Sequence, residues 1–127
     1  MSENKVKILF VCLGNICRSP MAEMIMKKMV KDAGREEEFE ISSAATSDEV
    51  IGYDIYPPAK ECLKKHDIPF QKRGARQVTD EDYLYYDHIF VMDWANLRDM
   101  KQRFGDEKGK IQMLMSLAGE EREIPDP

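Results

Sequence analysis

Cys12 and Arg18 have residue types and a spacing that suit chemistry on a phosphate group. They enclose five residues within the decapeptide VCLGNICRSP at positions 11–20. A cysteine thiolate can attack phosphorus, and the planar guanidinium of an arginine can donate two hydrogen bonds to two oxygens of one phosphoryl group. This spacing arises often by chance, so the flanking elements decide whether the two residues can act together.

The flanking sequence predicts a strand before this segment and a helix after it. Residues 5–11 are β-branched and aliphatic, as in a strand buried in a parallel sheet, whereas Ser19 can cap a helix and Pro20 can occupy its first turn. Loop N–H groups and the positive end of the helix dipole would then surround a phosphate, which Gly14 lets the backbone approach. Because the same field favours the thiolate form of Cys12, the segment predicts a phosphate-binding loop with an activated nucleophile.

Apolar segments of strand length alternate with segments of helical period along the chain. The expected strands are 5–11, 39–44, 87–92 and 111–115, and the expected helices are 19–33, 57–66 and about 94–103. Such alternation is typical of a doubly wound α/β fold with a parallel sheet, in which ligands bind beyond the carboxyl ends of the strands. The 127 residues, 43% of them hydrophobic, suffice for a single domain. The acidic runs at 36–38 and 80–82 are expected to be solvated surface.

Residues 11–23, VCLGNICRSPMAE, resemble the signature of the low-molecular-weight protein tyrosine phosphatases. Further segments fall in the order of that family: SSAATS at 42–47, ARQVT at 75–79, VMD at 91–93 followed by Asn96 and Leu97, and Asp126 with Pro127. The resemblance thus runs from residue 5 to residue 127. It implies a four-stranded parallel sheet in the order 2-1-3-4, flanked by helices, with the phosphate-binding loop between the first strand and the first helix.

The resemblance implies hydrolysis of phosphotyrosine in proteins, or of small aryl phosphates, without a metal or another cofactor. Cys12 would attack phosphorus and form a phosphocysteine, Arg18 would hold the phosphate, and Asp126 would act first as acid and then as base. A phenolate leaving group needs a proton donor, which agrees with a carboxyl group in this role. The residues alone leave an alternative for Asp126 open, because Asp-Pro is a common turn dipeptide.

Further residues match family positions that bind the phosphate or support the loop. The implied phosphate-binding set is Leu13, Gly14, Asn15, Ile16, Cys17 and Ser19, and Ser43 is a supporting residue. Asn15 suits the loop because asparagine tolerates left-handed backbone geometry and offers two donors and an acceptor. The family's paired cysteines imply a protective disulfide between Cys12 and Cys17, and a small buried side chain remains the alternative for Cys17.

One departure from the family pattern concerns the substrate pocket. Asp48 and Glu49 stand where aromatic residues often wall the slot for the phenol ring, so the effect of these two acids on specificity is open. Tyr53, Tyr56 and Trp94 are candidates for the missing wall, because an aryl ring packs on apolar faces. A structural role is an equal alternative for each of them.

Two other departures lie further along the chain. Arg73 and Gly74 replace a region that often contains a histidine, and no function is attached to this change. The family pattern continues beyond Asp126 and Pro127 with aromatic residues and a final helix. Two alternatives are open: a tail that this sequence omits, or a truncated phosphatase domain over residues 1–127 without that helix. In the second case we expect Asp126 to be held less firmly.

Two alternative functions remain. A protein-arginine phosphatase of the same fold has a similar loop with threonine in place of Ile16, so the isoleucine favours phosphotyrosine. A non-catalytic module that binds phosphate or phosphopeptides would keep the loop but lack a working acid. An arsenate reductase would need two further cysteines after the third helix, and residues 63–127 contain none, which argues against that reaction.

Composition bears on compartment and partners. Three cysteines without regular spacing argue for a reducing compartment, so we expect a cytoplasmic protein. The N-terminus has no apolar signal segment, and no apolar stretch reaches the length of a membrane span. The net charge of −5 argues against nucleic acid, and neither His66 nor His88 has a second metal ligand nearby in the sequence. We expect a monomer that binds no metal.

Overall fold

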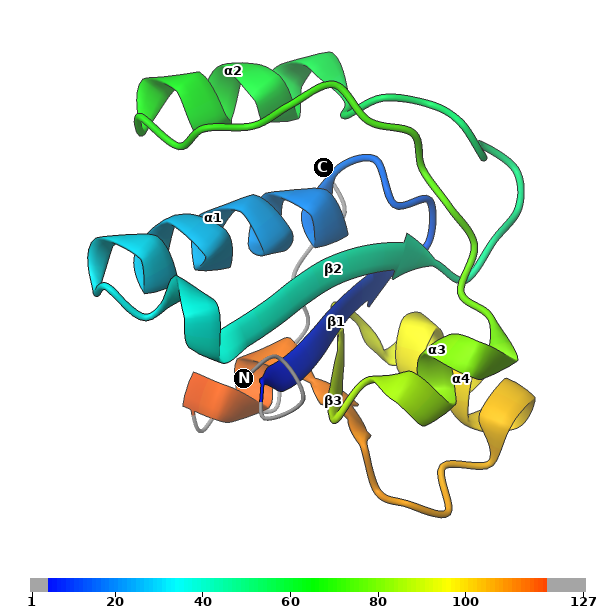
Figure 1. The fold of residues 1–127 in the computed structure, drawn as a ribbon. Helices are drawn as coiled ribbons and strands as arrows, with labels where there is room; N and C mark the ends of the chain where they lie inside the picture. Colours follow the sequence, from blue (N-terminus) through cyan, green and yellow to red (C-terminus); the bar gives the residue numbers. More distant parts are fainter. Residues whose placement is uncertain (1–4, 119–127) are drawn as a thin grey trace.

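A computed structural model describes residues 5–118 of the chain. Its centre is a four-stranded parallel sheet in the order β2-β1-β3-β4 (Figure 1). The strands are β1 (Val6–Cys12), β2 (Phe39–Ala45), β3 (His88–Val91) and β4 (Ile111–Met113). The α-helices are α1 (Arg18–Asp32), α2 (Pro57–Lys65), α3 (Asp80–Tyr85) and α4 (Trp94–Phe104), and two short 3₁₀ helices are η2 (Glu36–Glu38) and η3 (Leu114–Ala118). The predicted fold class and strand order are confirmed.

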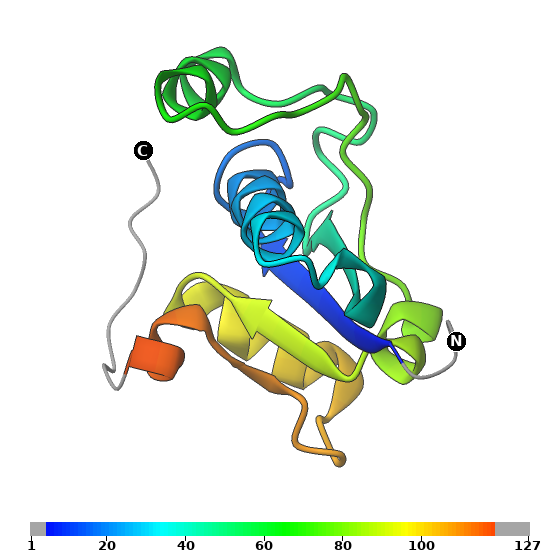
Figure 2. The same ribbon diagram turned by 60° about the vertical axis from the view of Figure 1, so that its left-hand side comes forward.

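The central strand β1 is apolar on both faces because helices cover both faces of the sheet (Figures 1 and 2). Ile8, Phe10 and Cys12 alternate with Leu9 and Val11, as side chains do along a strand. The first set packs in a buried cluster with residues of α1, and the second packs in another with residues of α3 and α4. The uninterrupted apolar run that predicted a buried parallel strand thus has a direct cause in the layered packing.

Helix α2 covers α1 rather than the sheet. Met24 of α1 is buried together with Ile55, Ala59 and Leu63, which come from α2 and the segment before it. Figure 2 shows α2 as an outer layer, on the side of α1 away from the strands. The chain between β2 and α2 must therefore cross over the end of α1, where the loop after β1 also lies.

Backbone hydrogen bonds fasten this crossing segment to the loop after β1. Thr46 N donates to Cys12 O at 3.0 Å, and Ser47 N donates to Leu13 O at 3.1 Å. Further along, Tyr56 N donates to Ile16 O at 2.7 Å. The carboxyl ends of β1 and β2 and the loops that follow them thus form one connected structure at a single edge of the sheet.

Helix α3 was not expected from the sequence, and the prediction that residues 80–82 are solvated surface is wrong for Asp82. This side chain is buried, and its Oδ2 accepts hydrogen bonds from Thr79 N at 2.9 Å and from Arg76 Nη1 at 2.8 Å. Asp82 N in turn donates to Thr79 Oγ1 at 3.2 Å, which completes a capping box. The threonine followed three residues later by an acid was the sequence signal for this helix start.

None of the helices in residues 5–118 combines the length and the apolar character that a membrane-spanning helix needs.

We predict that Asp82→Ala lowers the free energy of unfolding by about 2 kcal/mol, because it removes the carboxylate half of the capping box and leaves Thr79 N–H and Arg76 without their acceptor. Glu81→Ala is the matched control, since Glu81 is the exposed neighbour in the same helix turn and should change stability by less than about 0.5 kcal/mol. Urea unfolding of both variants and the parent chain measures these differences. Equal effects of the two substitutions would contradict the structural role of Asp82.

Candidate active site

The loop between β1 and α1 brings Cys12 and Arg18 to one cavity. Cys12 is the last residue of β1 and Arg18 the first of α1, so the strand, loop and helix predicted around them are confirmed. The predicted cap at Ser19 is wrong: Ser19 lies inside the first turn, Cys17 is at the N-cap, and no side chain caps the helix, because the Ser19 hydroxyl contacts Asn15 and Cys12 instead. The cavity has a volume of about 260 Å³. Its lining comes from this loop and from the crossing segment after β2: Cys12, Leu13, Gly14, Ile16, Cys17, Arg18, Ser47, Glu49, Val50 and Tyr56. Six of the predicted phosphate-binding and catalytic positions thus meet in space, and Asn15 and Ser19 are not among the lining residues.

Gly14 is where the loop and the crossing segment come closest in this cavity. A Cβ atom on Gly14 would lie 3.2 Å from Cγ2 of Val50 and 3.7 Å from Cγ1 of Ile16. The first distance is tighter than ordinary van der Waals contact. Glycine therefore allows Val50 to close one side of the cavity without a clash.

The sulfur of Cys12 is recessed and contacts two polar groups. The residue is 3% exposed, its Sγ accepts a hydrogen bond from Asn15 N at 3.3 Å, and it lies 3.0 Å from Ser19 Oγ. Hydrogen bonds to a sulfur stabilise negative charge on it more than they stabilise the neutral thiol. Cys12 and Cys62 carry free thiols, and the disulfide between Cys12 and Cys17 stays a prediction.

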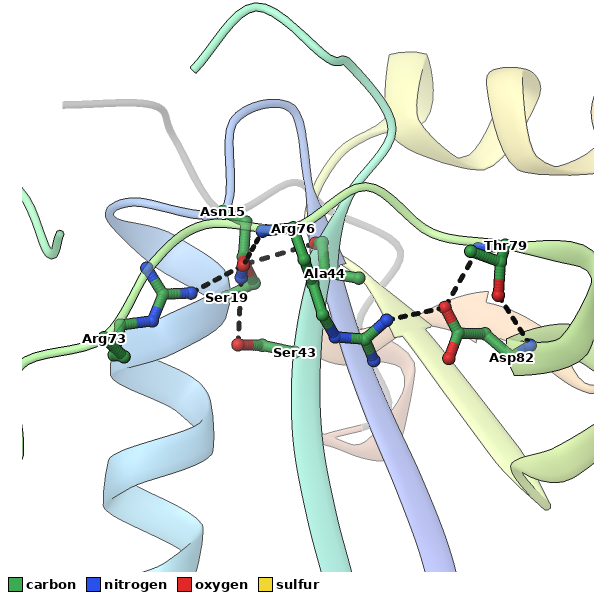
Figure 3. A network of polar contacts seen from close by, with 8 residues as sticks. All are labelled: Asn15, Ser19, Ser43, Ala44, Arg73, Arg76, Thr79 and Asp82. Atoms are coloured by element: carbon green, nitrogen blue, oxygen red, sulfur yellow. Dashed lines mark hydrogen bonds and ion pairs between the residues drawn. The ribbon is translucent and has the colours of Figure 1, made fainter. Parts of the chain in front are cut away.

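Asn15 links this sulfur to two distant segments (Figure 3). The residue is fully buried, and its φ of 58° places the backbone in the left-handed region that asparagine tolerates better than most residues. Its Nδ2 donates to Ser19 Oγ at 2.8 Å and to Ser43 Oγ at 2.9 Å. Its Oδ1 accepts from Arg73 Nη2 at 2.5 Å and from Arg76 N at 3.2 Å. Both ends of the amide are thus fixed by hydrogen bonds.

The hydrogen-bond chain continues from Ser43 to α1. Ser43 Oγ donates to Glu23 Oε1 at 2.5 Å, and Lys27 Nζ pairs with Glu23 Oε2 at 2.6 Å. Glu23 is buried, so this ion pair and hydrogen bond satisfy a carboxylate that would otherwise be costly to bury. The position of Ser43 predicted from the resemblance therefore lies next to Asn15, and Glu23 is a further member of the network that sequence reasoning did not single out.

Arg18 is held by the carboxylate of Asp93, which follows β3 at the start of α4. Its Nη1 lies 2.8 Å from Asp93 Oδ2, and both side chains are largely buried. The other oxygen of Asp93 accepts from Asn96 N at 2.8 Å and so caps α4. Sequence reasoning gave Asp93 no role, although an aspartate after a strand and three residues before an asparagine is a helix-start signal.

Arg73 is the third residue of the site that sequence reasoning missed, after Glu23 and Asp93. Burial lowers the pKa of its guanidinium, and the negative charges of Glu23, Asp54 and Cys12 act in the opposite direction. Its contact with Asn15 joins residues 58 positions apart, so no local sequence pattern could have indicated it. Arg73, to which the sequence analysis attached no function, thus places a cation next to the phosphate-binding loop.

The structure distinguishes the candidate walls of the substrate slot. Tyr56 and Glu49 line the cavity, whereas Tyr53 and Trp94 are exposed and are not among its lining residues. Asp48 is exposed beside Glu49. The predicted general acid, Asp126, lies outside the described residues.

Asp54 fastens the crossing segment to α2 and to Arg73. Its Oδ2 pairs with Lys60 Nζ at 2.6 Å, and its Oδ1 accepts from Ile55 N at 2.7 Å and from Arg73 N at 3.2 Å. The hydrogen bond from Lys60, followed by that from Ile55 N, lowers the pKa of Asp54 to about 2. The carboxylate form is therefore stabilised by folding.

We predict that Asp54 makes stability sensitive to acid. Because its folded pKa is depressed, its contribution is complete above the ordinary aspartate pKa of about 3.9 and is lost as the pH falls toward about 2. Asp54→Asn should therefore be less stable than the parent chain at pH 5, and this difference should shrink toward pH 2 in urea titrations. Asp48→Asn, an exposed aspartate of the same segment, is the control. A difference that stays constant across this range would refute the assignment.

Comparison with known proteins agrees with this geometry. The family model for low molecular weight phosphotyrosine protein phosphatase matches residues 7–127. The low molecular weight phosphotyrosine protein phosphatase of Homo sapiens is 44% identical over 124 residues, which cover 91% of this chain and 75% of that protein. The crystal structure of YfkJ from Bacillus subtilis is 33% identical with a TM-score of 0.91, covering 97% of this chain and 79% of that one. The crystal structure of DARP, the Drosophila arginine phosphatase, is 30% identical with a TM-score of 0.81, and the match covers 90% of this chain and 74% of that one. The chain therefore belongs to the low molecular weight phosphotyrosine protein phosphatases, a family of cysteine-dependent enzymes.

Proposed function

We propose that this enzyme removes phosphate from phosphotyrosine in proteins through a phosphocysteine formed on Cys12. The observation that carries the proposal is the position of the Cys12 sulfur. It lies recessed in a cavity that Arg18 also lines, and it accepts a hydrogen bond from Asn15 N. A nucleophile, a fixed cation and backbone donors in one cavity suit a phosphoryl group.

In the first step, loop N–H groups and Arg18 bind the phosphate oxygens, and Cys12 Sγ attacks phosphorus. The bond from phosphorus to the phenolic oxygen breaks, the electron pair stays on that oxygen, and Asp126 protonates it. In the second step, water attacks the phosphocysteine, the sulfur leaves as thiolate, and Asp126 takes the proton from the water. Asp93 positions Arg18 throughout, because the ion pair fixes the plane of the guanidinium.

The depth of the cavity supports an aryl phosphate as substrate. Cys12 is almost fully buried, and apolar atoms of Leu13, Ile16, Val50 and Tyr56 line the way to it. The ring of phosphotyrosine carries its phosphate farther from the peptide backbone than phosphoserine does, and the ring can pack on these side chains. Glu49 at the same cavity favours a substrate with a positive or neutral group nearby, since like charges repel.

Phosphoarginine is the second candidate substrate. The likeness to the arginine phosphatase DARP favours it only weakly, because that likeness is shared by the whole fold family. Ile16 lines the cavity with an apolar side chain, which offers no hydrogen-bond acceptor to a guanidinium group. A module that binds phosphate or phosphopeptides without turnover is the non-catalytic alternative.

The remaining assignments complete the proposal. We propose that residues 1–127 form one phosphatase domain, that the enzyme works as a cytoplasmic monomer, and that it needs no metal or cofactor. Leu13, Gly14, Ile16 and Cys17 contribute backbone N–H groups to the phosphate. The side chains of Asn15, Ser19 and Ser43 hold the loop in shape, as their mutual hydrogen bonds indicate.

We predict that Cys12→Ser abolishes hydrolysis of a phosphotyrosine peptide and that Asp126→Ala lowers kcat by a factor of about 10² to 10⁴, the usual contribution of a general acid. Cys62→Ser, which changes an exposed cysteine, is the control and should keep full activity. Steady-state kinetics in a metal chelator measures all four proteins on phosphotyrosine and phosphoarginine peptides side by side.

Three outcomes would contradict the proposal. Faster hydrolysis of the phosphoarginine peptide would overturn the inference that Ile16 favours phosphotyrosine. Loss of activity in the chelator would show that the enzyme needs a metal ion. Phosphate binding without turnover would indicate the non-catalytic module.

We also predict that Arg73→Met lowers kcat about tenfold with little change in KM. The variant removes a hydrogen bond that fixes Asn15, so the loop is less well organised for the transition state while substrate contacts persist. Lys72→Met, at the exposed neighbouring position, is the matched control and should retain kcat. If Arg73→Met instead raised KM at constant kcat, Arg73 would be a binding group for substrate.

A further inference from the structure

A second, larger cavity lies behind the phosphate-binding loop. Its volume is about 900 Å³, and it is bounded by α1, by the edge strand β2 and by residues 69–76. Asn15 forms part of its wall, so the loop separates this cavity from the one at Cys12. Met24, Phe39 and Phe70 contribute apolar surface. The volume is ample for a small organic molecule.

Positive side chains line this cavity from two sides. Lys27, Lys28 and Lys31 belong to α1, and Lys72, Arg73 and Arg76 belong to the segment that runs over it. Figure 3 shows Arg73 and Arg76 on this segment, on either side of Asn15. The acidic residues in the lining are Glu23 and Glu36. Positive charges thus outnumber negative ones in the cavity lining, whereas the chain as a whole has a net charge of −5.

Three of these cations have a carboxylate partner and three do not. The pairs are Lys27 with Glu23, Lys28 with Asp32, and Arg76 with Asp82. Within the described part of the chain, Lys31, Lys72 and Arg73 form no ion pair. Arg73 is the informative member, because it is half-buried and its side chain donates only to two neutral oxygens, Asn15 Oδ1 and Tyr53 O. The negative charges of Glu23, Asp54 and Cys12 act on it from farther away, and no described carboxylate is in direct contact with its guanidinium. A partly buried cation without a direct ion pair attracts an anion.

We propose that this cavity binds an anion carrying two or more phosphate groups, at a site separate from the catalytic one. Such an anion carries several charged oxygens, so it can use Lys31 from α1 together with Lys72 and Arg73 from the segment over it. Charge-assisted hydrogen bonds to ammonium and guanidinium groups supply the affinity. A nucleotide and a free polyphosphate share this chemistry.

Arg73 connects the site to the catalytic loop, an extension that rests on the proposed function. Its guanidinium donates to Asn15 Oδ1, and Asn15 N donates to the sulfur of Cys12. An anion in the cavity competes with Asn15 for Arg73 and withdraws one of the two hydrogen bonds to Asn15 Oδ1. The bond from Arg76 N remains, so the loop is loosened and not released. Bound polyphosphate therefore lowers kcat.

Calorimetric titration with tripolyphosphate tests the binding. The titration is done on the full chain at constant ionic strength, with inorganic phosphate saturating the catalytic loop. We expect a binding event that survives this phosphate and is weakened at least about tenfold in Lys31→Gln/Lys72→Gln, which loses two charge-assisted contacts. Lys101→Gln/Lys108→Gln, with two exposed lysines outside the cavity, is the matched control and should bind as the parent does.

Equal binding by all three proteins, or no binding once phosphate is saturating, would overturn the proposal. Because the titration needs no turnover, an inactive enzyme would leave this result unchanged, and the two proposals fail separately. A second titration, with adenosine triphosphate in place of tripolyphosphate, distinguishes a nucleotide ligand from a free polyphosphate. Binding at least about tenfold tighter indicates a nucleotide whose ring uses the apolar surface, and equal binding indicates that the phosphate chain alone is recognised.

Hydrolysis of a phosphotyrosine peptide at saturating substrate tests the connection. Competition at Cys12 disappears under this condition, so a fall in kcat reports the second site. We expect tripolyphosphate to lower kcat about fivefold in the parent and control, the lower end of typical coupling between sites, and to leave Lys31→Gln/Lys72→Gln unchanged. Tripolyphosphate that binds in the titration but leaves kcat of the parent unchanged would refute the role of Arg73 as the link.

Discussion

The structure of the site depends on one buried amide, that of Asn15. A left-handed backbone conformation and a fully buried polar side chain are both unfavourable unless hydrogen bonds fix them. Four hydrogen bonds do so here, and they come from α1, from β2 and from the segment around Arg73. The shape of the loop that encloses Cys12 is therefore imposed by the tertiary structure.

Much of the fold was predictable because its signals are local. The buried run of β1 and the alternation of strands and helices each reflect packing within a short segment. The strand order, by contrast, came from a family resemblance. Helix α3 was missed because its acidic first turn is also typical of a surface, and only Asp82 of that turn is buried, where it contacts Arg76 and Thr79 N.

The site was predictable where it is contiguous in sequence and less so elsewhere. The loop from Cys12 to Arg18 carries its chemistry within a few residues. Asp93 and Arg73 act on this loop across 75 and 58 positions, and nothing in their own neighbourhoods indicates which residue they contact. Such contacts arise from the way parallel strands bring their carboxyl ends together, and that depends on the three-dimensional arrangement.

Asp93 caps α4 with one carboxylate oxygen and holds Arg18 with the other. This one side chain thus serves both the start of α4 and the phosphate-binding site. Arg18 follows β1 and Asp93 follows β3, and these two strands pair in the sheet. A contact of this kind spans a long stretch of chain and forms slowly, because a large loop must close before it stabilises anything. The nucleophile consequently has its cationic partner in this orientation only while β1 and β3 are paired, so a partly unfolded chain in which this pairing is open does not carry a competent catalytic centre.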